Sequence, residues 1–492
     1  MNTNNIIYIY LIDKIKFIIY NVIVFFHFPS KKAFIYVFHR KLKKELIPII
    51  NSLTFNFKKM NSTYNKIIYL LSLSIKLKVD APILYLLTSI ADYITGKTDH
   101  WKEHRLKYIN EQNEKIYKFH KDGEKILIIE PGLITHTIGT SFNLDAWIKS
   151  KLLGFQKNNK LILPIIPSLK NKIVNQCMLN YFSKYVDIIY ESEKANYYYS
   201  LLDNIKCLYD EYIPCGRQVV PYAHSTGVYV QSIWDKENRK PLFTLDSNHY
   251  GKGREVIKKM GIPEDAWFVT CHVREPLFKN REDFRDSDIA TFFEAFKEIT
   301  DRGGWVIRMG DKSMSPLPKM NRVIDYAISE FKSDWMDVYL CASCKFMLGT
   351  SSGLSTISYI FGKPIAMTNN LPTAATYLSK RDLFMPRLMQ RLDNGKMISL
   401  IDSMTSPYNL AANDGMYRNI FKVKTLPNTS IEIKNLAIEM LERLDGSIKY
   451  TSAEEDLQSK FKRKTAEKEV MIGFPGFPIQ CRLGNQFLKN HL

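Results

Sequence analysis

The sequence predicts an α/β protein with two domains built on parallel sheets and a helical N-terminal extension. Three observations predict this class. The chain has 492 residues, too many for one ordinary hydrophobic core. Its composition, 45% apolar and 24% charged, is that of a globular protein. From Lys125 onward short apolar runs alternate with amphipathic segments, which is typical of βαβ units. We expect four regions, at 1–125, 126–250, 251–445 and 446–492.

The N-terminal region combines an apolar run with a dense basic patch. The chain carries a formal net charge of +19, and Lys and Arg far outnumber Asp and Glu before residue 60. Residues 6–28 are mostly apolar, but Asp13, Lys14 and Lys16 interrupt them, which argues against a signal peptide or a spanning helix. A basic segment follows at 31–45. We expect peripheral contact with an anionic membrane surface; a core helix with its charges at an exposed edge is the alternative.

The motifs and the cysteine content also limit the expected binding partners and the expected cellular location. No nucleic-acid-binding motif is visible, so we expect no nucleic-acid partner. The seven cysteines are scattered and odd in number, which favours reduced thiols in a cytosol. The expected location is therefore cytoplasmic, on the inner face of the cell membrane.

The region 126–250 opens with the apolar run KILIIEPG, a predicted buried strand ending at Gly132. A loop containing His136 and an amphipathic helix follow. A second strand is predicted at 160–167 and a helix at 174–189. We expect a small parallel sheet with helices packed on it.

The region 251–445 repeats the alternation after a polar linker at 236–262. Every predicted strand ends in a loop with polar or glycine residues, where open α/β sheets bind ligands. The expected strands are 267–275, 304–311, 345–353 and 363–369, and the expected helices are 288–303, 321–331, 337–344 and 354–362. The tail, 446–492, is charged and then apolar, and we expect its last part to pack back on the body.

Three of these strand ends suit anions. His272 and Arg274 alternate onto one face after the first strand, and Arg308 closes the next. The third end is a turn of small residues whose N–H groups and hydroxyls can approach oxyanions. Together they predict a phosphate or nucleotide-diphosphate site made of His272, Arg274, Arg308, Gly310, Asp311, Thr350, Ser351, Ser352 and Gly353. Taken singly, an arginine at a strand end usually pairs with a carboxylate, and such a turn is often only a turn.

The segment 349–353 also fits G-x-S-x-G, the serine-nucleophile turn of α/β-hydrolases. In that class the catalytic histidine follows the serine, and after Ser351 the chain has only His491, its penultimate residue. No HGGG-type motif, Walker motif or G-x-G-x-x-G is present either. A serine hydrolase, a Walker-type kinase and a dinucleotide dehydrogenase are therefore disfavoured.

Several blocks resemble a family of bacterial glycosyltransferases associated with surface-polysaccharide synthesis. They are HVREP, GGWVIRMGDKSMSPLP, KSDWMDVYLCASCKFMLGTSSGLS, FGKPIAMTN and the closing CRLGNQFL. The resemblance is dense over 267–390 and thinner over 126–250, and residues 1–125 do not share it. It implies the GT-B fold of two Rossmann-like domains and a nucleotide-sugar donor, GDP- or UDP-linked, with a surface-glycan or lipid-linked acceptor.

More distantly, HVRE and the TSSG turn are similar to segments of GDP-fucose-dependent fucosyltransferases. That similarity implies that Arg274 holds the donor β-phosphate, that Ser351 and Ser352 share its charge, and that the enzyme inverts without a metal or another cofactor. The transferase would then be hexosyltransferase- or fucosyltransferase-like.

A general base should come from the facing domain or the cleft rim. His136 is the first candidate and Glu275 the second; the alternatives are a loop-packing histidine and an ion pair. We read the D-x-D spacing of Asp286 and Asp288 as the start of a helix, not as a metal motif. A non-catalytic nucleotide- or glycan-binding protein with this fold is the rival function.

Overall fold

The computed structural model describes residues 125–154, 159–205, 212–215, 218–221, 230–275, 285–371, 379–405, 408, 415–468 and 480–492. The chain divides into two compact units, and the described residues all belong to the second, Asn113–Ile205 with Glu211–Leu492. The predicted membrane-contacting segments, 6–28 and 31–45, lie outside the described residues. No helix in the described part of the chain has the length and apolar character needed to cross a membrane.

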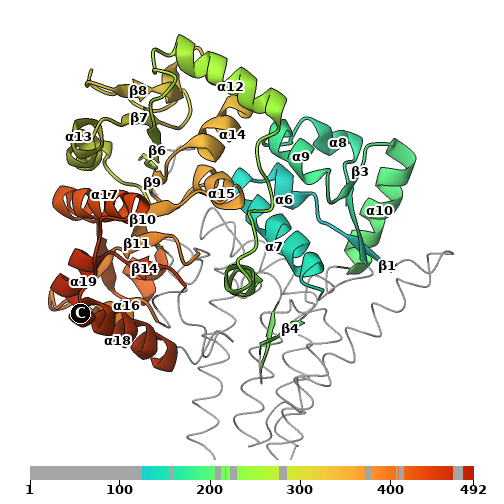
Figure 1. Ribbon diagram of the computed structural model, residues 1–492. Helices are drawn as coiled ribbons and strands as arrows, with labels where there is room; N and C mark the ends of the chain where they lie inside the picture. Colours follow the sequence, from blue (N-terminus) through green and yellow to red (C-terminus); the bar gives the residue numbers. More distant parts are fainter. Residues whose placement is uncertain are drawn as a thin grey trace, which may run out of the picture. The chain divides into compact units, whose positions relative to one another are not determined.

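The first α/β region carries a parallel sheet in the order β1-β2-β3. Around it lie several helices (Figure 1). The bounds are β1 Lys125–Ile128, α6 Gly132–Thr135, η1 Ile138–Thr140, α7 Ser141–Leu152, β2 Asn159–Pro164, α8 Pro167–Lys170, α9 Gln176–Phe182, β3 Asp187–Ile189 and α10 Ser192–Ile205.

The helix predicted over 174–189 is shorter than expected. It begins after Asn175, whose side chain accepts a hydrogen bond from the Met178 N–H, and it ends at Phe182. The residues beyond form β3, because their backbone pairs with β2 at Ile162–Pro164. The conformation of Asp187–Ile189 is therefore set by pairing with a neighbouring strand, which the local sequence pattern does not show.

The second α/β region is built on a parallel sheet in the order β14-β11-β10-β9-β6-β7-β8. The chain starts at β6, runs outward through β7 and β8, returns to β9 on the other side of β6 and continues outward. This doubly wound order has its switch point between β6 and β9. The bounds are β6 Phe268–His272, β7 Trp305–Arg308, β8 Val323–Asp325, β9 Met347–Gly349, β10 Ile365–Asn370, β11 Leu383–Pro386 and β14 Arg482–Leu483.

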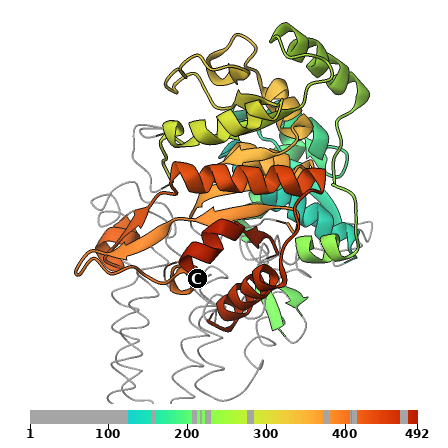
Figure 2. The same ribbon diagram turned by 60° about the vertical axis from the view of Figure 1, so that its left-hand side comes forward.

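Helices cover both faces of this sheet. α13 and α17 pack on each other and on its strands, while α14 and α15 pack together on the other side, with α12 against α14 (Figures 1 and 2). Strands β6, β9 and β10 are buried along nearly their whole length, as expected of a sheet covered on both faces. The bounds are α12 Ser247–Lys259, η4 Ile289–Phe292, α13 Phe293–Asp301, η5 Tyr326–Ile328, α14 Asp334–Ser343, α15 Gly353–Ile360, α16 Leu400–Ser403 and α17 Ser430–Asp445.

The helix predicted over 321–331 is wrong. Residues Val323–Asp325 form the edge strand β8, paired in parallel with β7, and only the short 3-10 turn η5 follows. The β-branched pair Val323 and Ile324 suits a strand, and the backbone of β7 supplies its hydrogen-bond partners. This strand brings Asp325 directly beside Arg308.

The C-terminal residues return to the large sheet. After α18, Ser452–Lys468, strand β14 pairs in parallel with β11, and α19, Asn485–His491, packs against α17 and α18 (Figure 2). Smaller elements complete the fold: the antiparallel pairs β4 Tyr212–Cys215 with β5 Gln218–Pro221 and β12 Leu388–Arg391 with β13 Val423–Leu426, and the π-helix η8 Met416–Ile420. The α/β class with parallel sheets is confirmed.

Candidate functional site

The candidate site lies at the carboxyl ends of β9, β6 and β7, three adjacent strands of the large sheet. In the strand register His272 is opposite Gly349, and Cys271 is opposite Arg308. The three predicted strand ends are therefore side by side. They flank the switch point between β6 and β9, where doubly wound sheets bind ligands.

The loops after β6 and β9 are joined through Thr350. Its backbone N–H donates to the His272 carbonyl oxygen (3.0 Å), and its buried hydroxyl accepts from the Arg274 N–H (3.1 Å). Gly349 makes this approach possible: its φ is +150°, and a Cβ there would overlap the His272 carbonyl oxygen. Thr350 thus positions the Arg274 backbone instead of facing a ligand.

The small-residue turn ends at the N-terminus of α15. Ser352 is the N-cap: its hydroxyl accepts from the Ser355 N–H, and Ser355 bonds back to the Ser352 N–H in a capping box. Ser351, just before it, is half-buried. The first turn of α15 therefore presents the positive end of a helix dipole at the switch point.

The first region reaches this same helix end. A Cβ on Gly353 would overlap the Ile138 side chain and lie 3.1 Å from the Gly139 nitrogen, so η1 packs directly on the α15 N-terminus. His136 is exposed and lies two residues before Ile138. The loop that carries the predicted base thus meets the loop that carries the predicted anion site.

Arg274 keeps part of its side chain in solvent. Its Nε donates to Asp286 Oδ1 at 3.3 Å, and 14% of its side chain is exposed. Asp286 itself precedes η4, whose N-cap Asp288 accepts from the Ala290 N–H at 2.9 Å. The D-x-D pair therefore starts a helix, as predicted. Within the described residues no group of acidic, histidine or cysteine side chains is arranged to hold a metal ion.

Arg308 is placed differently. Its side chain is 0% exposed and lies between two carboxylates, Glu275, and Asp325 at 2.9 Å. It also donates to the Ser315 carbonyl oxygen at 3.2 Å. Arg308 was expected to contact the diphosphate of the sugar donor, and the structure corrects this. Its guanidinium is buried and its charge is neutralised by two carboxylates, so Arg308 forms the ion pair that was the alternative.

Glu275 is the other half of that arrangement. One carboxylate oxygen pairs with Arg308 and the other accepts from the Ser315 N–H at 3.0 Å. Both oxygens are thus engaged in joining the β6 loop to the loop after β7. Its expected role as a base gives way to the ion-pair alternative.

His272 ends β6, and Asp311 lies in the loop after β7. Burial, reinforced by the positive charges of Arg308 and Arg274, lowers the pKa of His272 to about 4, so the ring is neutral at pH 7. Burial alone would raise the pKa of Asp311, but hydrogen bonds from the Ser313 hydroxyl and N–H hold it below its usual value. Gly310 turns the chain before it, with φ +153°.

Sequence reasoning missed Arg387, which directly follows β11 at the same edge of the sheet. Its buried guanidinium donates to the Ser287 hydroxyl at 3.1 Å and to the Asp286 carbonyl oxygen. It therefore supports the segment that holds Asp286 against Arg274. Because no strand was expected over 383–386, no signal in the sequence pointed to Arg387.

His491, the histidine that a serine hydrolase would need, pairs with Glu432 on α17 at 2.9 Å. That pairing uses its Nε2 in packing the last helix onto the body. His491 is thus engaged by Glu432 and not by Ser351.

Comparisons with known proteins give one weak likeness. No protein-family description and no curated protein matches the chain. A solved structure described as the glycosyl transferase family 9 protein from Veillonella parvula is similar over 68% of this chain and 87% of its own, with 8% identity and a TM-score of 0.29. A likeness of this size carries no argument, so the fold and the site stand on the topology and contacts above.

Proposed function

We propose that this chain is a glycosyltransferase that moves a sugar from a nucleotide-sugar donor to a surface-glycan or lipid-linked acceptor. One observation carries the proposal: Arg274, the α15 N-terminus and the His136 loop meet at the switch point of a doubly wound sheet. Cations and helix N-termini suit a diphosphate. The resemblance of HVREP and TSSG to donor-binding segments agrees with this placement.

In the proposed reaction the acceptor hydroxyl attacks the anomeric carbon. The bond from that carbon to the diphosphate oxygen breaks, and its electron pair leaves with the nucleoside diphosphate. Arg274 and the positive end of the α15 dipole stabilise the charge that develops there. A single displacement inverts the anomeric centre, and the protein's own cation supplies the charge that a metal would.

The hydroxyl proton goes to His136 in this proposal. The residue is exposed on the loop that packs against α15, whereas both oxygens of Glu275 are engaged by Arg308 and the Ser315 N–H. Glu275 and Arg308 instead fix the loop from which Arg274 projects. Peripheral attachment through 6–28 and 31–45 would bring a lipid-linked acceptor to this site; deletion of residues 1–60 should then release the protein from membranes.

The test is release of nucleoside diphosphate from a panel of GDP-, UDP- and CDP-sugars with an acceptor extract. We expect Arg274→Ala to lower turnover by roughly 10²–10³-fold, the cost of removing one preorganised charge-stabilising donor. His136→Asn should lower kcat by roughly 10²-fold or more with little change in KM. Lys319→Ala, an exposed cation between β7 and β8, is the matched control and should keep wild-type activity.

Two outcomes would overturn the proposal. Unchanged turnover in Arg274→Ala would remove the assigned site, and binding without release from any donor would favour a non-catalytic nucleotide- or glycan-binding protein. A fluorophosphonate probe should leave Ser351 unlabelled, since His491, the histidine that follows it in the chain, pairs with Glu432.

A further inference from the structure

A second polar site lies at the opposite edge of the large sheet. A cavity of about 520 Å³ is lined by residues that include Lys380, Arg443, Tyr450, Glu455, Lys462 and Arg482. Lys380 precedes β11 and Arg482 begins β14, so the cavity sits at the amino ends of these parallel strands. The candidate donor site is at the carboxyl ends. The volume is that of a pocket for a small molecule.

The two arginines of this cavity are only partly satisfied. Arg443 donates through Nη2 to the Lys380 carbonyl oxygen (3.3 Å), but its buried Nη1 has no hydrogen-bond partner among the described residues. Arg482 pairs through Nη1 with Glu455 (2.8 Å), and its buried Nη2 likewise has no partner in the described chain. Native proteins rarely leave buried donors unused, so these two N–H groups call for a partner such as a bound anion.

Lys462 adds a third positive charge. Its ammonium donates to the Gln480 carbonyl oxygen at 3.3 Å. Burial, with the nearby charges of Arg482 and Arg443, lowers the pKa of Lys462 although Cys481 and Glu455 act in the other direction. The three cations therefore repel one another in a half-buried space where Glu455 is the carboxylate among the lining residues.

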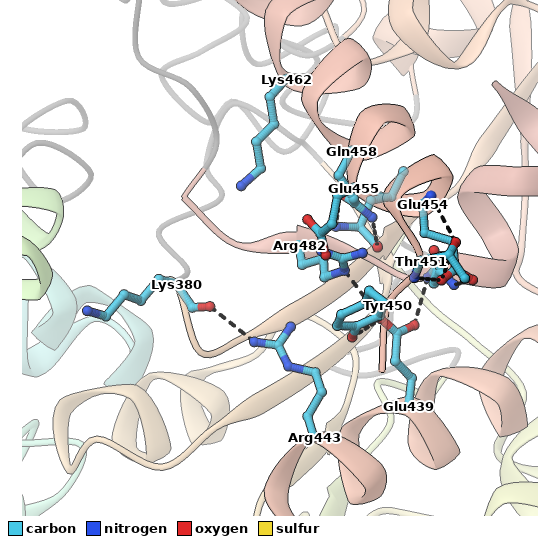
Figure 3. A network of polar contacts seen from close by, with 12 residues as sticks. Lys380, Glu439, Arg443, Tyr450, Thr451, Glu454, Glu455, Gln458, Lys462 and Arg482 are labelled. Atoms are coloured by element: carbon cyan, nitrogen blue, oxygen red, sulfur yellow. Dashed lines mark hydrogen bonds and ion pairs between the residues drawn. The ribbon is translucent and has the colours of Figure 1, made fainter. Parts of the chain in front are cut away.

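Figure 3 shows how these side chains are directed. Arg443, Lys462 and Arg482 surround the same region, whereas the Lys380 ammonium points the other way, toward the Asp235 carbonyl oxygen (2.9 Å). The guanidinium carbon of Arg482 lies 3.5 Å from the centroid of the Tyr450 ring, and its Nε lies 3.7 Å from Glu439. The Tyr450 hydroxyl donates to the same Glu439 carboxylate at 2.7 Å. Arg482 has the Glu455 carboxylate as an ion-pair partner, whereas the ion pairs of the described residues include none for Arg443 or Lys462.

We propose that this cavity binds a phosphate-bearing small molecule, with Arg443 and Lys462 as its principal contacts. A phosphate group offers several acceptor oxygens to donors that approach from different elements, and arginine suits it through paired N–H groups. Ile448 and the Tyr450 ring provide surface for the rest of the ligand. The site is separate from the proposed donor site and does not depend on glycosyltransferase activity.

The experiment measures the melting temperature of the full chain with inorganic phosphate or glucose 6-phosphate against sodium chloride of equal ionic strength. We expect at least one phosphate probe to raise the wild-type value by about 2 °C or more at saturation. The exposed-surface control Lys460→Gln should respond as the wild type does. The double variant Arg443→Gln/Lys462→Gln should respond no more than to the salt.

A second measurement separates ligand binding from a structural role. Without any probe, the double variant should melt at the wild-type temperature or above, because two mutually repelling cations are gone. If the phosphate is that of a lipid, flotation with phosphatidylglycerol vesicles should fall in the double variant and not in Lys460→Gln. The proposal is overturned if the double variant responds to the soluble probes as the wild type does, or if neither soluble probes nor vesicles distinguish the two proteins. Loss of the response in Arg274→Ala instead would move phosphate binding to the donor site.

Discussion

Arg274 and Arg308 lie at the ends of neighbouring strands, yet the structure uses them differently. Arg308 is the last residue of β7, so its side chain stays within the layers of the fold and pairs with Glu275 and Asp325. Arg274 is two residues beyond β6, contacts Asp286 at 3.3 Å and keeps 14% of its side chain exposed. Arg308, within its strand, is fully buried between carboxylates, whereas Arg274, beyond its strand, keeps the exposure that the proposed role requires.

The largest effect that would sharpen this comparison is expected from Arg308→Met. The change leaves Glu275 and Asp325 without their buried cation, and breaking such a pair costs about 3–5 kcal/mol. Urea unfolding would measure the loss, with Lys319→Met as the exposed control. A variant as stable as the wild type would show that the buried charges do not depend on each other.

Gly349→Ala should have the next largest effect. The added methyl would overlap the His272 carbonyl oxygen and force an alanine to φ +150°, so steric strain should cost about 2–4 kcal/mol and disturb the link to Arg274. Gly261 also has a positive φ, +84°, but has open space around it. Gly261→Ala is therefore the control that measures the cost of the positive φ without the steric overlap. Equal melting temperatures for the two variants would contradict the close approach of β6 and β9.

The smallest effect concerns His272 and pH. Its folded pKa, about 4, is below the unfolded value of about 6.5, so the unfolded state binds more protons between these values and stability falls as pH falls. At pH 5 the loss relative to pH 7 is at most about 2 kcal/mol. Thermal unfolding of wild type and His272→Asn at both pH values checks this. The variant should lose less stability on acidification, and an identical loss would argue that the ring is solvated.

The site was predictable where it depended on the local pattern of residues. Apolar runs ending in polar turns located the ends of β6, β7 and β9, and parallel pairing then places them together. The function of Arg308 was not predictable in this way. Its partner Asp325 belongs to 321–331, which the helical pattern misassigned; only the pairing of β8 with β7 brings the carboxylate to the guanidinium.

The cavity at the amino edge was invisible for a related reason. Arg443, Lys462 and Arg482 come from the end of α17, from α18 and from β14, three elements with no shared motif. The tail was expected to pack back on the body, but only the pairing of β14 with β11 determines where its charges fall. In both candidate sites, residues far apart in the sequence are brought together by pairing between strands, which a single sequence does not reveal.

The central claim is that Arg274 holds a donor diphosphate at the switch point. Calorimetric titration of GDP and UDP into the wild type, Arg274→Ala and Lys319→Ala tests it most directly. A charged hydrogen bond contributes about 1.5–3 kcal/mol, so the account predicts roughly 10–100-fold weaker binding in Arg274→Ala and no change in Lys319→Ala. Equal affinity in all three proteins would contradict the claim.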